Sequence, residues 1–235
     1  MRKALVISAL LIFSVTANAQ LLKIFGKEVG FIYVGPKVGA TYSTISNFSD
    51  MSGSNTQYRM GYQIGGVGEF VFTEKISFQT EVLFYSRGTK MNAADSKIKM
   101  NYVGIPLLAK YSFKAIGFTK LYAMGGTFTD IRTKGVEEYS GAAAANGTVD
   151  LPSGFKKYDW GFSFGAGAEY PTDKGIWGLD FRYNLGMTDL TNFTGETIKN
   201  RSRSFGLSLT YKYDLTKLLS KNKKKDNSKT TTPTK

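Results

Sequence analysis

The chain has 235 residues and carries 31 Lys and Arg against 18 Asp and Glu, a formal net charge of +13. It has 26 Gly, 14% aromatic residues, and neither Cys nor His. These absences exclude disulfides, thiolate nucleophiles, lipid anchoring through an N-terminal Cys, Cys or His zinc sites and His-dependent acid–base catalysis.

The first 19 residues have the pattern of a secretory signal peptide. Arg2 and Lys3 precede an apolar run, and Ala17-Asn18-Ala19 fits a cleavage site. The apolar run is shorter than the roughly 20 residues that a membrane-spanning helix needs. We therefore expect an exported chain that starts at Gln20, with residues 20–30 forming a short N-terminal periplasmic segment.

The segment from residue 31 to residue 215 alternates between large apolar residues and small or polar ones, which is the period of β-strands. A hairpin over residues 159–187 shows this most plainly, because its large side chains share one face and Gly or Ser occupies the other. The pattern predicts eight strands, at 31–45, 58–72, 76–87, 98–113, 118–132, 159–170, 176–187 and 201–215.

The polarity of the two faces indicates a membrane protein. A soluble barrel would place its large apolar side chains inward, but the small face of these strands has too few charges to form a water-facing surface. In a transmembrane barrel the large residues face lipid and the lumen takes Gly, hydroxyls and paired charges. We therefore predict an all-β fold, an eight-stranded antiparallel up-and-down transmembrane β-barrel. The expected lipid belt includes Phe162, Phe164, Leu179 and Phe181, with Trp160, Tyr170 and Trp177 at the membrane interfaces.

The predicted connections alternate between long and short. This asymmetry is typical of outer-membrane barrels with long extracellular loops, and it places both termini in the periplasm. Residues 133–157 are expected to form a surface loop with a turn at Asn146-Gly147. The other long polar loops are expected at 47–57, 90–97 and 188–200.

Two strands carry residues that predict local irregularity. Pro106 removes a ladder donor, so we expect a bulge or irregular pairing there. The second strand contains Gly61, Gly65, Gly66 and Gly68, which predicts bending or close contact with neighbouring backbone.

Residues 216–235 contain seven Lys and one Asp. This composition predicts a basic, disordered periplasmic tail. An electrostatic contact between the tail and an anionic periplasmic surface is the alternative.

The alternation also places charged residues of both signs in the lumen. An eight-stranded barrel is barely wide enough for its own side chains, so these charges must pair. We expect a structural salt-bridged network, and proton or ion conduction along it is the functional alternative. Its predicted members are Lys37, Glu69, Glu81, Arg87, Lys110, Glu169, Asp180 and Arg182.

Catalysis has little support in the sequence. Asp180 and Glu81 can be considered as a carboxylate pair, but their predicted depth leaves no room for substrate. Gly165-Ala-Gly167 lies within a strand and cannot cradle a phosphate, so no cofactor or metal is expected. The basic charge is concentrated in a tail without interleaved aromatic residues, which argues against nucleic-acid binding. We therefore expect a protein that is not an enzyme.

The last predicted strand carries Ser204, Gly206, Leu209 and Tyr211 at the spacing of the signal that the barrel assembly machinery reads. Six motifs in order resemble the PorT-like, or "porin family", eight-stranded outer-membrane barrels of Bacteroidota, and the resemblance covers residues 31–213. The motifs are Gly35–Gly39, Gln79–Tyr85 with Gly88, Ile105–Lys110, Gly165–Glu169, Asp180–Asn184 with Gly186, and Gly206–Tyr213.

This resemblance implies an outer-membrane location, with lipid and the barrel assembly machinery as partners. We expect a scaffold or accessory barrel of the cell envelope that contacts other envelope or secretion proteins, and the resemblance to PorT suggests type IX secretion as one setting. A small passive channel is the alternative, and an outer-membrane enzyme is a more distant one.

Overall fold

The computed structural model describes residues 23–24, 27–28, 31–47, 56–91, 96–113, 117, 119–141, 144–152, 154–191 and 199–215. The predicted signal peptide and basic tail lie outside these residues. Within them, no helix is long and apolar enough to cross a membrane.

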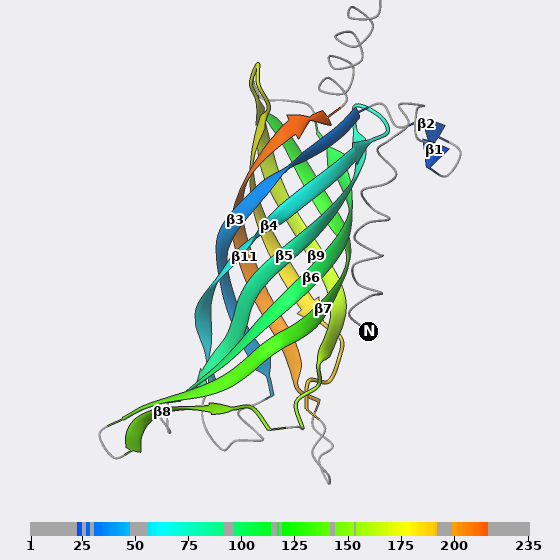
Figure 1. Cartoon of the computed structure of the whole chain (residues 1–235). Coiled ribbons are helices and arrows are strands. Elements are labelled where there is room, and N and C mark those ends of the chain that lie inside the picture. The colour runs from blue at the N-terminus through cyan, green and yellow to red at the C-terminus, as the bar shows by residue number, and fades with distance from the viewer. Residues whose placement is uncertain are drawn as a thin grey trace, which may run out of the picture.

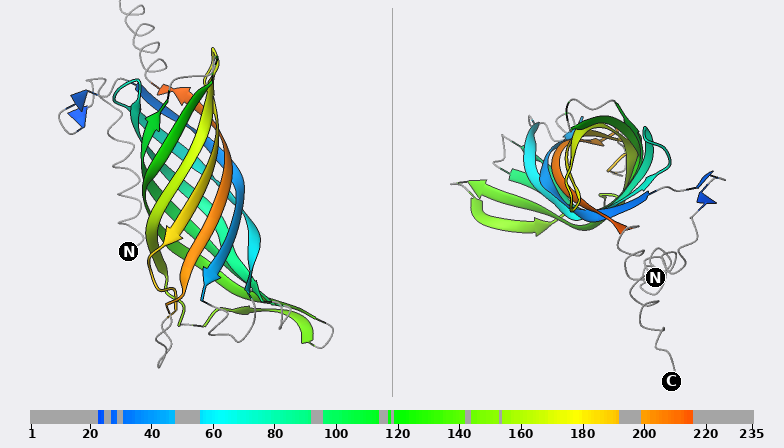
Figure 2. Two further views of the ribbon diagram at one scale, coloured as in Figure 1. Left: turned by 180° about the vertical axis from the view of Figure 1, so that it is seen from behind. Right: turned by 90° about the horizontal axis from the view of Figure 1, so that it is seen from above.

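Eight antiparallel strands form a closed barrel (Figure 1). Each barrel strand pairs with the next one along the chain, and pairing of the last with the first closes the ring seen down the axis in Figure 2. This confirms the predicted eight-stranded all-β fold. The strands are β3 (Phe31–Ser46), β4 (Thr56–Val71), β5 (Ile76–Met91), β6 (Ser96–Ser112), β7 (Lys120–Gly141), β9 (Tyr158–Pro171), β10 (Ile176–Gly186) and β11 (Arg201–Asp214).

Three short strands lie outside the ring. β1 (Lys23–Ile24) pairs with β2 (Lys27–Glu28), and β8 (Ala144–Asp150) pairs with β7. The end of the barrel that the β7–β8 hairpin extends is here called the hairpin end, and the opposite end, where β3 begins and β11 ends, the terminal end (Figure 1).

The outer wall has the polarity that the sequence predicts for a lipid-facing surface. Phe164 on β9 and Phe181 on β10 are 54% and 53% exposed, although both are large and apolar. The residues next to them in sequence point inward, since Ser163 and Asp180 are buried. The other predicted belt residues, Phe162 and Leu179, are also exposed.

The prediction of a surface loop over residues 133–157 is wrong for residues 133–141 and 144–150, which lie in strands. β7 continues to Gly141 and β8 returns beside it, with Tyr139 opposite Gly147 and Gly141 opposite Ala144. Asn146 and Gly147 therefore lie within a strand, and the chain reverses before them. The small, polar composition of this segment concealed the strands because neither face of an extended hairpin has to be apolar when it projects into water (Figure 2).

The prediction of a loop at residues 90–97 is also wrong at both ends of that segment. β5 and β6 stay in register as far as Lys90 opposite Lys97 and Met91 opposite Ser96, which leaves residues 92–95 outside the described part of the chain. The predicted strict alternation of long and short connections fails at this hairpin, where the strands themselves are longer instead.

The β5–β6 ladder is interrupted near Pro106, as the sequence predicts. Pairing stops after Thr80 opposite Leu107 and resumes at Leu83 opposite Gly104, without a change of register. A bulge that shifts the register lies on the other side of β6, between Asn101 and Tyr102. Pro106 therefore interrupts pairing without shifting it.

A second bulge separates the hairpin-end parts of β4 and β5, between Tyr58 and Gln63. The glycine-rich sequence of β4 permits it, because a Cβ at Gly61 would lie 2.1 Å from the Ser86 carbonyl oxygen. Side chains of β3 reach across the bulge to the backbone of β5. The Thr41 hydroxyl donates to the Ser86 carbonyl over 2.8 Å, and the Gly88 amide donates to the Ser43 hydroxyl over 2.9 Å.

Replacing Thr41 by Val is expected to destabilise the barrel by about 1 to 3 kcal/mol, because a buried backbone acceptor loses its partner while side-chain volume is retained. Urea unfolding of the protein in lipid vesicles measures this loss. Thr80→Val on the outer wall of β5 is the control, since no hydrogen bond of its hydroxyl is found among the described residues. Equal stability of the two variants would contradict the bridging role of Thr41.

Candidate functional site

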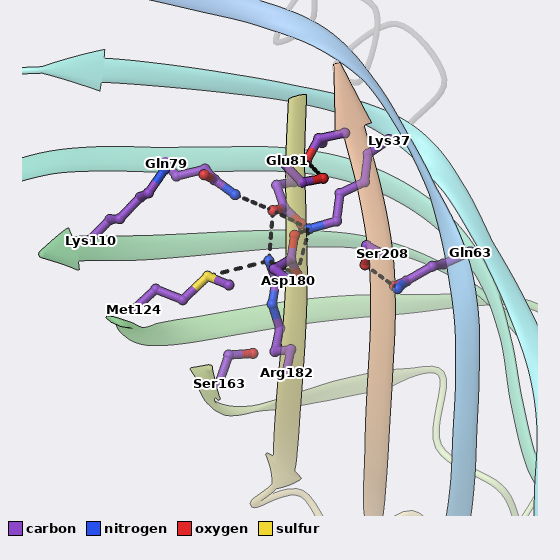
Figure 3. Close-up of polar contacts among 12 residues, drawn as sticks. Lys37, Gln63, Gln79, Glu81, Lys110, Met124, Ser163, Asp180, Arg182 and Ser208 are labelled. Carbon is purple, nitrogen blue, oxygen red and sulfur yellow. Dashed lines mark hydrogen bonds and ion pairs between the residues drawn. The ribbon is translucent and has the colours of Figure 1, made fainter. Parts of the chain in front are cut away.

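The middle of the lumen holds a cluster of buried charges, here called the central cluster (Figure 3). Lys37 Nζ lies 2.9 Å from a carboxylate oxygen of both Glu81 and Asp180. Arg182 donates two hydrogen bonds to Glu81, over 2.7 and 2.9 Å, and Gln79 donates a further one over 2.6 Å. Two cations therefore balance two anions, and Glu81 is the residue that most of the contacts share.

A second group of four charges lies nearer the terminal end and is here called the quartet. Lys110 and Lys212 each form ion pairs with both Glu69 and Glu169. Lys110 Nζ also lies 4.0 Å from the centroid of the Tyr122 ring, within the range of a cation–π contact. The quartet is electrically neutral like the central cluster, so neither group leaves an uncompensated charge in the lumen.

A third charged group lies toward the hairpin end. Arg87 Nη1 donates to Asp130 over 2.9 Å, and its guanidinium lies 4.3 Å from the centroid of the Tyr85 ring. Asp159 is also buried and accepts a hydrogen bond from the Ser202 hydroxyl. One cation thus faces two carboxylates here, and hydroxyl donation partly compensates the second carboxylate.

Apolar side chains fill the lumen beyond this third group, and they are here called the plug. Phe155 and Leu190 belong to connections that fold over the mouth, where Phe155 pairs with Thr191 and the Lys156 amide donates to the Leu190 carbonyl over 2.8 Å. The buried apolar residues of the plug are Ile45, Met91, Ile98, Met100, Phe155 and Leu190.

The terminal end is more open. A cavity of about 270 Å³, here called the vestibule, lies there, and Glu69, Glu169 and Ser77 are among its lining residues. Its rim is largely apolar, with Phe31, Phe72 and Ile176 contributing. The quartet separates this vestibule from the central cluster.

Every charged residue that the sequence places in the lumen is buried there and has at least one ion pair. The central cluster takes Lys37, Glu81, Asp180 and Arg182, the quartet takes Glu69, Lys110 and Glu169, and the third group takes Arg87.

Sequence reasoning missed Lys212, Asp130 and Asp159 as members of these clusters. Lys212 alternates in phase with Ser208 and Thr210, which face inward, so the alternation of β11 already contained its signal. Asp130 and Asp159 lie near the ends of the predicted strands 118–132 and 159–170, where the pattern alone did not separate a lumen residue from a loop residue.

The residues of the assembly-signal pattern occupy both faces of β11. Ser204 is buried, and its hydroxyl accepts a hydrogen bond from Asn184 Nδ2 over 3.2 Å. Leu209 lies on the outer face, 44% exposed, and Gly206 lies opposite Thr41 of β3. The pattern thus lies in a paired strand beside the β11–β3 closure, and its reading by the assembly machinery stays a prediction.

The site can be described chemically as a set of mutually compensated ions. Among the described residues, no group of three or more His, Cys, Asp or Glu is arranged to hold a metal ion. The carboxylate pair considered from the sequence, Glu81 and Asp180, is bridged by Lys37 and contacted by Arg182.

A closed ring of eight antiparallel strands with an apolar exterior and a charge-paired interior defines a transmembrane barrel of the outer-membrane class. The sequence matches the outer membrane protein beta-barrel domain family over residues 18–192, and the chain belongs to that family. It is therefore an integral outer-membrane β-barrel protein. No curated protein sequence matches the chain.

Several solved structures are similar to this barrel. The outer membrane protein OprG from Pseudomonas aeruginosa is 14% identical, with 80% of this chain and 98% of that chain covered and a TM-score of 0.49. Neisserial surface protein A is 13% identical, with 77% and 97% covered and a TM-score of 0.46. The outer membrane protein AlkL is 15% identical, with 85% and 96% covered and a TM-score of 0.46.

Proposed function

We propose that this protein is a non-enzymatic scaffold or accessory barrel of the cell envelope, with a lumen that does not conduct solutes. The observation that carries the proposal is the occupation of the lumen. Glu81 alone binds Lys37, Arg182 and Gln79, and the plug covers the hairpin end. The charged side chains of the lumen bind one another. The outer surface and the two ends of the barrel are therefore the parts that can contact other proteins.

The proposed orientation places both termini in the periplasm and the hairpin end outside the cell. The strands β5, β6 and β7 have 16, 17 and 22 residues, which exceeds the roughly 9 to 11 that cross a bilayer. Their excess length lies at the hairpin end, and longer extracellular elements are typical of outer-membrane barrels. The β6–β7–β8 sheet is then the surface best placed to contact an external partner.

The resemblance of the sequence to PorT-like barrels of Bacteroidota makes type IX secretion one candidate setting for such an accessory role. The lysine-rich tail is not part of that resemblance, so the resemblance does not support a periplasmic partner that binds the tail. The barrel assembly machinery is the partner that the pattern in β11 implies during insertion.

The closed lumen leads to an expected electrical result. Purified protein in planar bilayers should give no steady single-channel conductance, and vesicles that contain it should not admit small sugars. The vestibule at the terminal end favours the second candidate, a small passive channel. Steady conductance with sugar permeation would establish that candidate and remove the closed-barrel proposal.

The accessory role predicts that the barrel is recovered with other envelope proteins. Crosslinking and affinity capture from intact outer membranes should yield the same partner repeatedly. A variant in which a two-glycine turn replaces residues 137–149 should lose an external partner, because that change removes the projecting hairpin and keeps the pairing of β7 with β6 as far as Val136 opposite Lys99. Recovery of the intact barrel alone, from cells whose secretion does not change on its deletion, would argue against the accessory role.

A further inference from the structure

We propose that the outer wall at the hairpin end binds the phosphate groups of anionic lipid in the outer leaflet. The site is a strip of cations on β4, β5, β6 and β7, here called the basic strip. It rests on the orientation proposed above and does not depend on the lumen being closed. Its members are Arg59, Lys90, Lys97, Lys99 and Lys134.

The strand registers place these cations side by side on the outside of the barrel. Lys90 on β5 lies opposite Lys97 on β6, and Lys134 on β7 lies opposite Asn101. Lys97 and Lys99 continue the face of β6 that exposes Ile105 and Leu107 to lipid. The basic strip is therefore the continuation of the lipid belt toward the hairpin end.

Arg59 joins the strip because of the β4 bulge. Its Nη1 donates to the Ser86 hydroxyl over 3.1 Å, and its Cδ would lie 3.4 Å from a Cβ built on Gly88. Gly88 is also the strand partner of Lys99. Arg59 on β4 and Lys99 on β6 thus approach the same residue of β5 from its two neighbouring strands.

The strip has more positive charge than its neighbours compensate. Glu138 lies 3.7 Å from Lys99, and both side chains are about one-third or more exposed. Glu138 is also the β7 partner of Lys97, and Glu137 of β7 and Asp150 of β8 are the other carboxylates in this part of the sheet, so three carboxylates stand against five cations. Lys90 and Lys97 face one another directly, and like charges opposite each other in a sheet are destabilising unless an anion lies between them.

The position of the strip selects lipid as the source of that anion. Lys99 lies four residues beyond Val103, or roughly 13 Å along the strand at the usual rise, so it lies just past the apolar belt. Headgroup phosphates occupy this depth, and Arg and Lys are the residues that bind phosphate oxygens through charge-assisted hydrogen bonds. The next barrel strand, β9, presents Tyr158 and Trp160 on its outer face.

The test measures how much diphosphoryl lipid A stays bound to the barrel in native mass spectrometry from detergent micelles. Replacing Lys90, Lys97 and Lys99 together by Gln should lower the bound fraction about tenfold or more. The matched control replaces Lys75, Lys120 and Lys174 by Gln at the terminal end and should bind as the original chain does. Glu138→Gln should strengthen binding because it removes the competing carboxylate of the strip.

Heat-modifiable gel migration verifies that each variant is folded. Unchanged binding by the triple variant, equal loss in the control, or equal retention of lipid A without its phosphates would overturn the proposal. The conductance and capture experiments do not involve these lysines, so failure of the scaffold role and failure of the lipid site are distinguishable.

Discussion

Glu81→Ala is expected to destabilise the folded barrel by about 3 to 5 kcal/mol, because removing one partner of a buried ion pair leaves uncompensated charge in the interior. Lys37 would keep only Asp180, and Arg182 would lose both of its short hydrogen bonds. The free energy of unfolding in urea, followed by Trp fluorescence of the protein in lipid vesicles, measures the effect.

A double variant separates charge imbalance from the loss of side-chain volume. Lys37→Met combined with Glu81→Leu removes one cation and one anion and leaves Arg182 beside Asp180, whose atoms are 3.6 Å apart. Replacing a buried ion pair by apolar residues of similar volume is often neutral or stabilising. The double variant should therefore be more stable than Glu81→Ala, and the opposite order would show that the lumen tolerates unpaired charge.

The barrel itself follows from the sequence because its strands obey a strict constraint. Each residue of β9 and β10 faces either lipid or lumen, so Phe164 and Asp180 could be assigned to opposite sides by parity alone. The inward charges were found in the same way. Lys37 and Arg182 are 145 positions apart in sequence, yet the requirement for pairing in a narrow interior places both in one network.

Features outside that constraint were not predictable. The β7–β8 hairpin projects beyond the membrane, where neither face must be apolar, so the alternation that identifies membrane strands is absent. The plug was missed because most of its residues lie at inward positions of β3, β5 and β6, on the face where Gly, hydroxyls and paired charges were expected. Ile45 and Ile98 are inward and apolar because Phe155 and Leu190 fold over the mouth, and that contact depends on connections without periodicity.

The outer wall gives the second large expected effect. Phe164→Arg should destabilise the inserted barrel by about 2 to 4 kcal/mol if this position lies at the middle of the membrane, because a charged side chain on the lipid face must leave water. Tyr158→Arg on the same face of β9 is the matched control. Tyr158 is six residues nearer the hairpin end and is also exposed, so its replacement should cost at most about 1 kcal/mol near the interface.

The contrast between the two variants tests the placement of the membrane without assuming its exact depth. Arg at Phe162 should give an intermediate loss, since this residue lies between the two positions on the same face. Heat-modifiable migration and urea unfolding in vesicles report insertion and stability for each variant. A loss that rises steadily from Tyr158 through Phe162 to Phe164 is the result expected of a strand that enters the bilayer from the hairpin end. Equal tolerance of Arg at Phe164 and Tyr158 would mean that this face of β9 does not contact lipid.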